Sequence, residues 1–197
     1  MASSHPRAKR SVFATQVGFS ALDLIMGMAL AVVLCGLAAP PMQGLLSRYR
    51  TLSEAHELNQ LLVFARSEAI RRSARVTVCR STSFASNRPN CDGERWDQGW
   101  IAFVDNTDTI SNRPGVLDGA DQLLRIGVGR PTVRIEPTVT YRDWLAFTPT
   151  GRPISSMGLG NGTFCLLDGS SRRDVVIAIT GRVSVTAPLT FPTQATC

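Results

Sequence analysis

The stretch FSALDLIMGMALAVVLCGLAA, residues 19–39, decides the fold. It is an almost unbroken apolar run, and a helix over it rises about 1.5 Å per residue to reach roughly 31 Å, the thickness of a bilayer core. The run holds one acid, Asp23. A carboxylate near the end of a membrane helix costs on the order of a few kcal/mol, so it normally has a purpose or a partner.

A short basic leader, residues 1–18, precedes this run. The leader has three basic residues and no acid, which predicts a cytoplasmic N-terminus. A cleaved secretory signal would have a shorter apolar core, and a lipoprotein signal at Cys35 would need small residues directly before the cysteine. A plain signal anchor explains the length of the run but leaves Asp23 without a purpose.

A basic leader that ends in Gly18, followed by Phe19 and an apolar helix with an acid at its fifth position, resembles a type IV prepilin signal. The resemblance implies that a membrane peptidase cuts after Gly18 and methylates the new amino group of Phe19. It implies that the apolar helix anchors the chain in the inner membrane and later lies in the core of a filament. There Asp23 would serve assembly by pairing with a neighbour's N-terminal amine, since a buried carboxylate needs a positive partner. Pro40 and Pro41 stand where many pilins have a helix-kinking proline.

Residues 42–72 have the period of an amphipathic helix. Its apolar side chains recur at steps of three and four and predict one buried stripe of Leu45, Tyr49, Leu52, Ala55, Leu58, Leu62, Ala65 and Ala69. The opposite face carries the charged residues Arg48, Arg50, Glu54, Glu57, Arg66, Glu68 and Arg71. We therefore expect one long helix, transmembrane over 19–41 and amphipathic over 42–72.

Residues 73–197 change to short alternating segments with turn signals between them. Strands are expected at 74–80, 100–104, 123–128, 132–136, 145–148, 163–167, 174–179 and 182–186. The predicted fold class is α+β, a lollipop whose long N-terminal helix packs on an antiparallel β head.

The motifs of the head, in their order, are similar to those of the FimT/FimU minor pilins and GspH pseudopilins. They are ARSEAI at 65–70, VTVCRS at 76–81, GWIAF at 99–103, FTPTG at 147–151, TFC at 163–165 and GRV at 181–183. The resemblance implies a periplasmic head, processing by the prepilin peptidase, and partners among major and minor pilins or pseudopilins. Three functions stay open: a minor pilin in pilus biogenesis, a pseudopilin of type II secretion, or an anchored β domain that does not polymerise.

Five cysteines are present, and four of them lie in the head. Cys35 falls in the apolar run as a free thiol. An oxidising periplasm favours disulfides among Cys79, Cys91, Cys165 and Cys197, and four cysteines allow three pairings. We favour a short local loop closed by Cys79–Cys91, with Cys165–Cys197 tying the C-terminal tail to a strand.

Metal and catalytic sites are not expected. The cysteines form no C-x-x-C pair and the head contains no histidine, which disfavours zinc and removes Ser-His and Cys-His arrangements. No phosphate-binding loop motif is present. We therefore expect a protein that is not an enzyme and needs no cofactor.

Double-stranded DNA is a candidate partner, because FimT-type pilins have been linked to DNA uptake. The family's Gly-Arg-x-Arg segment is matched by GRVS at 181–184, which keeps Arg182 and has serine at the second position. Arg172, Arg173 and Arg152 could supply the lost charge, since arginine suits phosphate and base contacts. The leader accounts for +3 of the formal net charge of +6, so binding would be weak and sequence-independent.

Overall fold

The computed structural model describes most of the chain, in two units. The described residues are 18, 20–106, 114–119, 121–158, 160–169, 171–187, 189–190 and 197, with the backbone alone at 37–41 and 189–190. The compact units are Met1–Pro40 and Pro41–Cys197. The leader up to residue 17 and the methylation site Phe19 lie outside the described residues. The predicted kink at the two prolines is not tested and stays a prediction.

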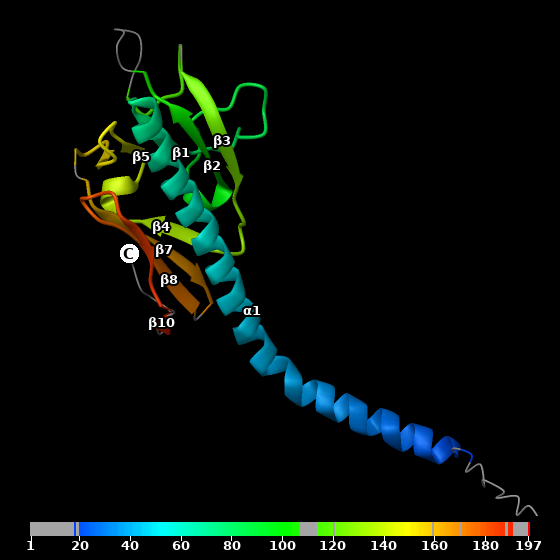
Figure 1. Ribbon diagram of the computed structural model, residues 1–197. Helices are drawn as coiled ribbons and strands as arrows, with labels where there is room; N and C mark the ends of the chain where they lie inside the picture. Colours follow the sequence, from blue (N-terminus) through cyan, green and yellow to red (C-terminus); the bar gives the residue numbers. More distant parts are fainter. Residues whose placement is uncertain are drawn as a thin grey trace, which may run out of the picture. The chain divides into compact units, whose positions relative to one another are not determined.

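Helix α1 spans Ala21–Arg72 and is continuous in sequence through both units (Figure 1). It begins with a reciprocal cap. The Ser20 hydroxyl accepts a hydrogen bond from the Leu22 N–H at 3.3 Å, and the Asp23 carboxylate accepts one from the Ser20 N–H at 3.1 Å. Two backbone donors of the first turn are thereby satisfied, so Asp23 has a local role in this structure.

Within the described residues, no helix combines the length and the hydropathy that crossing a membrane requires. The membrane anchor predicted over residues 19–41 is therefore not confirmed.

The strands of the head form two antiparallel sheets. The first sheet has the order β3 (Gln122–Val128), β2 (Gly99–Val104), β1 (Val76–Arg80), β5 (Trp144–Phe147) and β6 (Pro153–Ser155). The second has the order β10 (Leu189–Thr190), β8 (Ser171–Ile177), β7 (Gly162–Asp168) and β4 (Arg134–Pro137), with β9 (Val183–Val185) also paired to β8. The short 3₁₀ helices are η1 (Trp96–Gln98) and η2 (Val139–Tyr141). The predicted α+β class is confirmed, while β6 and β10 were too short to show alternation in the sequence.

The inner strands β1 and β2 of the first sheet are buried on both faces, whereas the edge strand β3 is mostly exposed. Along β2, Trp100, Ala102 and Val104 join the main core with α1, while Ile101 and Phe103 belong to a second, smaller cluster. This alternation follows from the two-residue period of a strand. Both cores therefore depend on one central strand.

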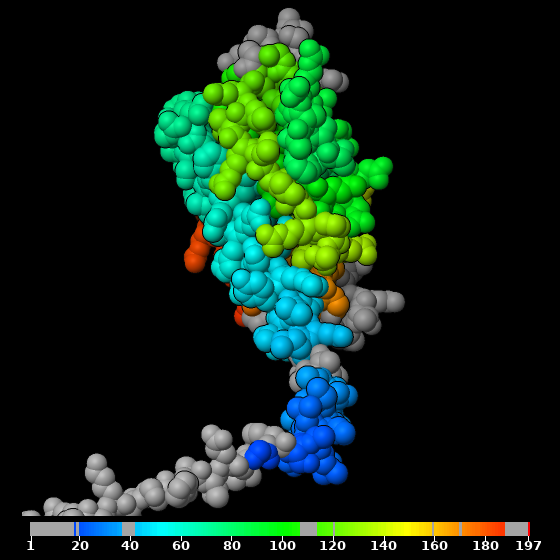
Figure 2. Space-filling model, turned by 90° about the vertical axis from the view of Figure 1, so that its right-hand side faces the viewer, coloured from blue at the N-terminus to red at the C-terminus, as the bar shows by residue number. Residues whose placement is uncertain are grey.

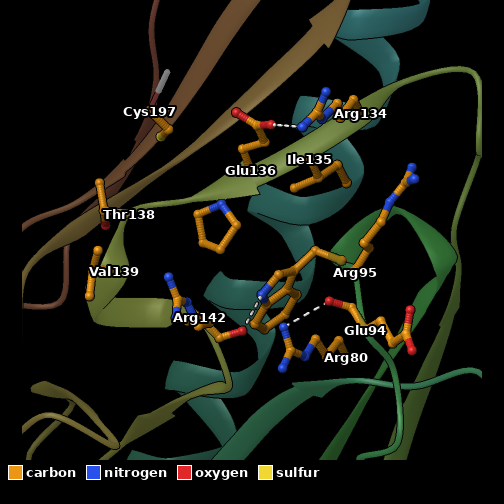
Figure 3. A pocket seen from close by; sticks show the side chains of 12 residues that line it. Arg80, Glu94, Arg95, Arg134, Ile135, Glu136, Thr138, Val139, Arg142 and Cys197 are labelled. Carbon is orange, nitrogen blue, oxygen red and sulfur yellow. Dashed lines mark hydrogen bonds and ion pairs between the residues drawn. The ribbon is translucent and has the colours of Figure 1, made fainter. Parts of the chain in front are cut away.

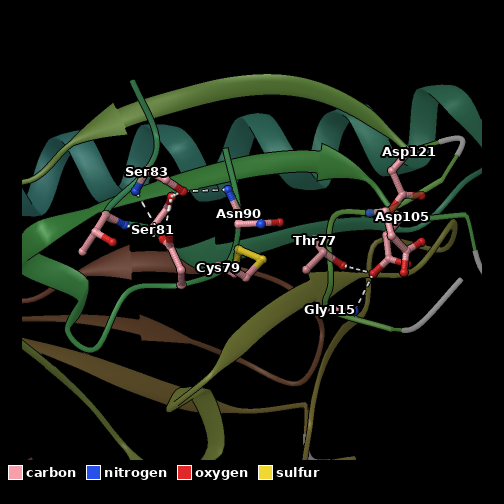
Figure 4. The surroundings of a disulfide bond; sticks show 12 residues. Thr77, Cys79, Ser81, Ser83, Asn90, Asp105, Gly115 and Asp121 are labelled. Carbon is pink, nitrogen blue, oxygen red and sulfur yellow. Dashed lines mark hydrogen bonds between the residues drawn. A yellow bond between two sulfur atoms is a disulfide. The ribbon is translucent and has the colours of Figure 1, made fainter. Parts of the chain in front are cut away.

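The Cys79–Cys91 disulfide ties a loop over the second cluster (Figure 4). In this loop Asp92 accepts hydrogen bonds from the backbone N–H groups of Thr82 at 2.8 Å and Ser83 at 3.2 Å. Burial raises the pKa of the Asp92 carboxyl, but the hydrogen bonds outweigh it and bring that pKa to about 2. The second disulfide joins Cys165 to Cys197, so the two bonds follow the pairing that the sequence favours.

Asp105, which directly follows β2, is a buried acid with a full set of partners. It accepts hydrogen bonds from the Thr77 hydroxyl at 2.6 Å and the Gly115 N–H at 2.9 Å (Figure 4). The Arg75 guanidinium donates a third, at 2.8 Å. Hydrogen bonds to an ionised group are about twice as strong as neutral ones. The carboxylate therefore joins β1 to the loop after β2.

In the second unit, one face of α1 is buried against the sheets. The buried stripe contains the expected Ala55, Leu58, Leu62, Ala65 and Ala69. The prediction was wrong at the start of the stripe, where Leu45 and Tyr49 are exposed.

At the start of the stripe, polar residues of α1 face the sheets, because α1 contacts the β7–β8 hairpin through hydrogen bonds. The Ser47 hydroxyl donates to the Asp168 carbonyl, and the Thr51 and Ser171 hydroxyls bond at 2.9 Å. The apolar side chains of these turns therefore point outward. In Figure 2 this part of α1, in cyan, lies at the surface beside the yellow-green β3–β4 segment.

Candidate functional site

Three motifs that are far apart in the sequence meet at Arg66. This arginine lies in the ARSEAI segment of α1 and donates from Nε to the Gly151 carbonyl and from Nη2 to the Thr180 carbonyl, each at 3.0 Å. Gly151 ends the FTPTG motif between β5 and β6, and Thr180 directly precedes the GRV motif between β8 and β9. We call this arrangement the Arg66 junction. It joins the helix to one turn of each sheet.

Glycine is required at the two turns of the junction. Gly151 and Gly181 both have left-handed backbones, with φ of +74° and +81°. A Cβ atom at Gly181 would lie 2.0 Å from the Gly151 carbonyl oxygen. A side chain there would therefore force the turns apart, which explains why the motifs contain glycine.

The junction brings together two of the four arginines predicted to contact DNA. Arg152 and Arg182 directly follow the junction glycines and are exposed. The other two serve the head itself: Arg172 forms an ion pair with Asp174 at 2.7 Å, and Arg173 donates to a backbone carbonyl at 3.2 Å. The predicted cluster of four is thus split into two pairs.

The periodicity of the sequence predicts Glu54 on the exposed polar face of α1. This prediction was wrong. The side chain is fully buried. Its nearest cation is Arg130 of the β3–β4 loop, at 3.5 Å, and the same guanidinium lies 3.7 Å from Glu57. Neither oxygen of Glu54 accepts a hydrogen bond from the described residues. Glu54 lies four residues before the buried Leu58, and residues four apart share a helix face. This spacing could have indicated that Glu54 is buried.

The pKa of the Glu54 carboxyl is raised to about 7. Loss of solvent is the largest cause, repulsion by Glu57 adds to it, and attraction by Arg130 opposes it. Burial without hydrogen bonds disfavours the charged form. Glu54 therefore changes charge near neutral pH, inside the contact between α1 and the head.

A pocket of about 360 Å³ opens between η1 and β4 (Figure 3). Its charged lining residues are Arg80, Glu94, Arg95, Arg134, Glu136 and Arg142, and its other lining residues are Trp96, Ile135, Pro137, Thr138, Val139 and Cys197. These residues come from well-separated parts of the chain, so no local pattern in the sequence marks the pocket.

Residues 54–181 match a protein-family model described as type II transport protein GspH. The match contains Glu54, the Arg66 junction and both glycine turns, and it covers more than half of the chain. The chain belongs to the GspH family. Minor type IV pilins and pseudopilins make up this family, and they are structural proteins.

A solved minor-pilin structure supports the fold of this GspH-family chain. The type IV minor pilin FimU of Pseudomonas aeruginosa is similar with a TM-score of 0.52 and 21% identity, over 71% of this chain and 90% of FimU. The minor pseudopilin EpsH of the type 2 secretion system of Vibrio cholerae has a TM-score of 0.47 and 10% identity, over 70% of this chain and 96% of EpsH. Among curated proteins, none matches the sequence.

The predicted sites of the GspH-family chain are spread along it. Gly18, which precedes α1, and Asp23, in its first turn, belong to the first unit, and the arginines and disulfides lie in the second. Within the described residues, no cluster of three or more potential metal ligands occurs.

Proposed function

We propose that this chain is a minor pilin that is cleaved after Gly18, methylated at Phe19 and assembled into a type IV pilus through α1. The observation that carries the proposal is the apolar surface of this one helix. Its exposed apolar side chains are Leu22, Leu24, Ile25, Met26, Met28, Leu30, Val32, Val33, Leu34, Met42, Leu45, Leu46 and Tyr49. Exposed apolar side chains in such number mark contact with lipid or other proteins.

The apolar helix acts twice in this proposal. Residues 19–41 first hold the chain in the inner membrane with the head in the periplasm, and then pack against helices of neighbouring pilins. Asp23 accepts the N-terminal amine of a neighbour, and the charge pair lowers the cost of a carboxylate among apolar side chains. Its bond to the Ser20 N–H keeps the carboxylate at the helix start until then.

Processing tests the proposal directly. Gly18→Leu should keep the leader when the full chain is made with a prepilin peptidase, and it should be absent from sheared filaments. Gly44→Leu is the matched control, because neither glycine has a neighbour within 4 Å of an added Cβ. Intact mass and filament immunoblots measure the outcome. Cleavage of Gly18→Leu with normal incorporation would contradict the proposal.

The GspH-family match favours one alternative, a pseudopilin of type II secretion. The two functions differ in what is lost with the gene. A pilus subunit is needed for surface filaments, whereas a pseudopilin is needed for release of secreted proteins. Deletion and complementation with the full chain separate them. An anchored domain that does not polymerise would affect neither process.

We further propose that Arg152 and Arg182 make a weak contact with DNA phosphates. Their support is the Arg66 junction, which sets their two turns side by side. A double change of Arg152→Ala and Arg182→Ala should weaken duplex binding by the full chain, and binding should fall steeply with added salt. Arg172→Ala is the control, because Arg172 is paired with Asp174. Equal loss in the control would overturn the proposal.

A further inference from the structure

We infer that the pocket between η1 and β4 binds an acidic peptide segment of a partner protein, taking one apolar side chain into the pocket and flanking carboxylates onto its rim. At about 360 Å³, the pocket is near the small end of the range for ligand sites. This volume suits a single large side chain. The contact is separate from the assembly role of α1.

The floor of the pocket is apolar and held in place. Trp96 donates its indole N–H to the carbonyls of Tyr141 at 3.0 Å and Arg142 at 3.3 Å, and its ring packs edge-on against Phe164. Val139 is exposed in the lining. A floor fixed by hydrogen bonds and ring packing loses little entropy when a ligand binds.

On the rim, the guanidinium groups of Arg95 and Arg134 are more exposed than the carboxylates that pair with them. Arg95 is 57% exposed while its partner Asp97 is 1% exposed, and Arg134 is 67% exposed against 26% for Glu136. Each of these ion pairs therefore turns its positive end toward solvent. The planar guanidinium matches a carboxylate with two parallel hydrogen bonds.

Arg142 adds to the rim a positive charge that forms no ion pair with the described residues. Its side chain is exposed, and in the described part of the chain its guanidinium has neither an ion pair nor a hydrogen bond. Figure 3 shows it beside Val139, on the η2 side of the pocket. A ligand carboxylate can therefore bind Arg142 without displacing a partner already in place.

The opposite side of the pocket favours a peptide over a nucleic acid. There Arg80 donates to the Glu94 carbonyl at 2.9 Å and to the Asp143 carboxylate at 3.1 Å. Glu94, which lines the pocket, and Asp143, which follows Arg142 in the chain and lies outside the lining, are both exposed. They would repel a phosphate backbone that continued across the pocket, whereas a short peptide can place its acids on the positive side alone.

Fluorescence anisotropy with a labelled probe peptide tests the inference. The probe is Gly-Asp-Glu-Phe-Asp-Glu-Gly, titrated with the full chain in neutral detergent at low salt. Two variant peptides replace Phe by Ser, or the four acids by Lys. Arg142→Glu and Val139→Asp should each weaken the probe at least about tenfold, because each removes a favourable contact that the proposal requires. Arg88→Glu, at an exposed arginine outside the pocket, should stay within about twofold.

The inference requires saturable binding that depends on both the Phe and the acids. Absence of saturable binding up to millimolar protein would overturn it, as would equal loss in Arg88→Glu and Arg142→Glu. A single-stranded oligonucleotide that loses more affinity than the peptide on Arg142→Glu would overturn it in favour of a nucleic-acid site. None of these readouts depends on filament assembly.

Discussion

Asp105 of the head and Glu54 of α1 are both buried acids, but their surroundings differ. Asp105 accepts hydrogen bonds from Thr77, Arg75 and Gly115. Glu54 accepts none from the described residues and has one half-exposed cation, Arg130, at 3.5 Å. Burial costs an acid its hydration, and only hydrogen bonds and nearby cations restore what is lost. Burial alone therefore does not say whether a carboxylate stabilises a fold.

Removing the well-bonded acid should have the largest effect. Asp105→Ala leaves the Arg75 guanidinium and the Thr77 hydroxyl without their partner, so we expect a loss of about 3–5 kcal/mol of unfolding free energy. Urea unfolding of the full chain in detergent, followed by tryptophan fluorescence, measures it. Asp143→Ala is the control, since its pair with Arg80 is exposed and worth about 1 kcal/mol or less. Equal losses in the two variants would show that the bonds of Asp105 contribute little.

Neutralising the poorly bonded acid should have the opposite sign. The pKa of Glu54 rises from 4.5 to about 7 on folding, so the folded chain binds the extra proton and stability falls as the pH rises through this window. Glu54→Gln should match the wild type at pH 4.5 and exceed it by about 1–3 kcal/mol at pH 8. Urea unfolding at both pH values measures the difference. A variant that is less stable than wild type at pH 8 would refute this reading.

Removing Arg130, the cation beside Glu54, should increase the difference between Glu54 and Asp105. Arg130→Ala takes away the attraction that lowers the pKa of Glu54, and we expect a loss of about 1 kcal/mol at pH 8 and little change at pH 4.5. In the Glu54→Gln background the same change should have almost no effect. A double-mutant cycle measures this coupling. Additive losses would mean that Arg130 acts elsewhere.

Glu57 should give the smallest effect. Glu57→Gln removes its repulsion of Glu54 but also its own contact with Arg130 at 3.7 Å. These terms oppose each other, so we expect a gain of only a few tenths of a kcal/mol at pH 8. Careful thermal unfolding in matched buffers can resolve it. A loss above about 1 kcal/mol would place Glu57, and not Glu54, at the centre of this ion cluster.

The α+β class could be predicted because the period of the sequence changes at the end of the long helix. The cysteine pairing was also within reach, since Cys79 and Cys91 are close in sequence. The start of the buried stripe was not, because Ser47 and Thr51 turn inward through hydrogen bonds to a hairpin more than a hundred residues away. The hydropathy pattern alone cannot predict such long-range hydrogen bonds.

The candidate sites were harder to predict than the fold. Each motif of the Arg66 junction was visible in the sequence, but their meeting at one guanidinium was not. The pocket could not be predicted, because its positive rim depends on how unequally the members of two ion pairs are exposed, Arg95 more than Asp97 and Arg134 more than Glu136. A net charge counted from the sequence gives both members of an ion pair equal weight, so it does not show that the arginine is the more exposed member.

The Arg66 junction has a mechanical consequence. A pull on α1 that reaches Arg66 meets two hydrogen bonds, one to a turn of each sheet. A force that reaches Arg66 is therefore divided between the two sheets. The close contact of Gly181 with the Gly151 turn also resists sliding between the two turns. The head can therefore withstand tension at this point as one body.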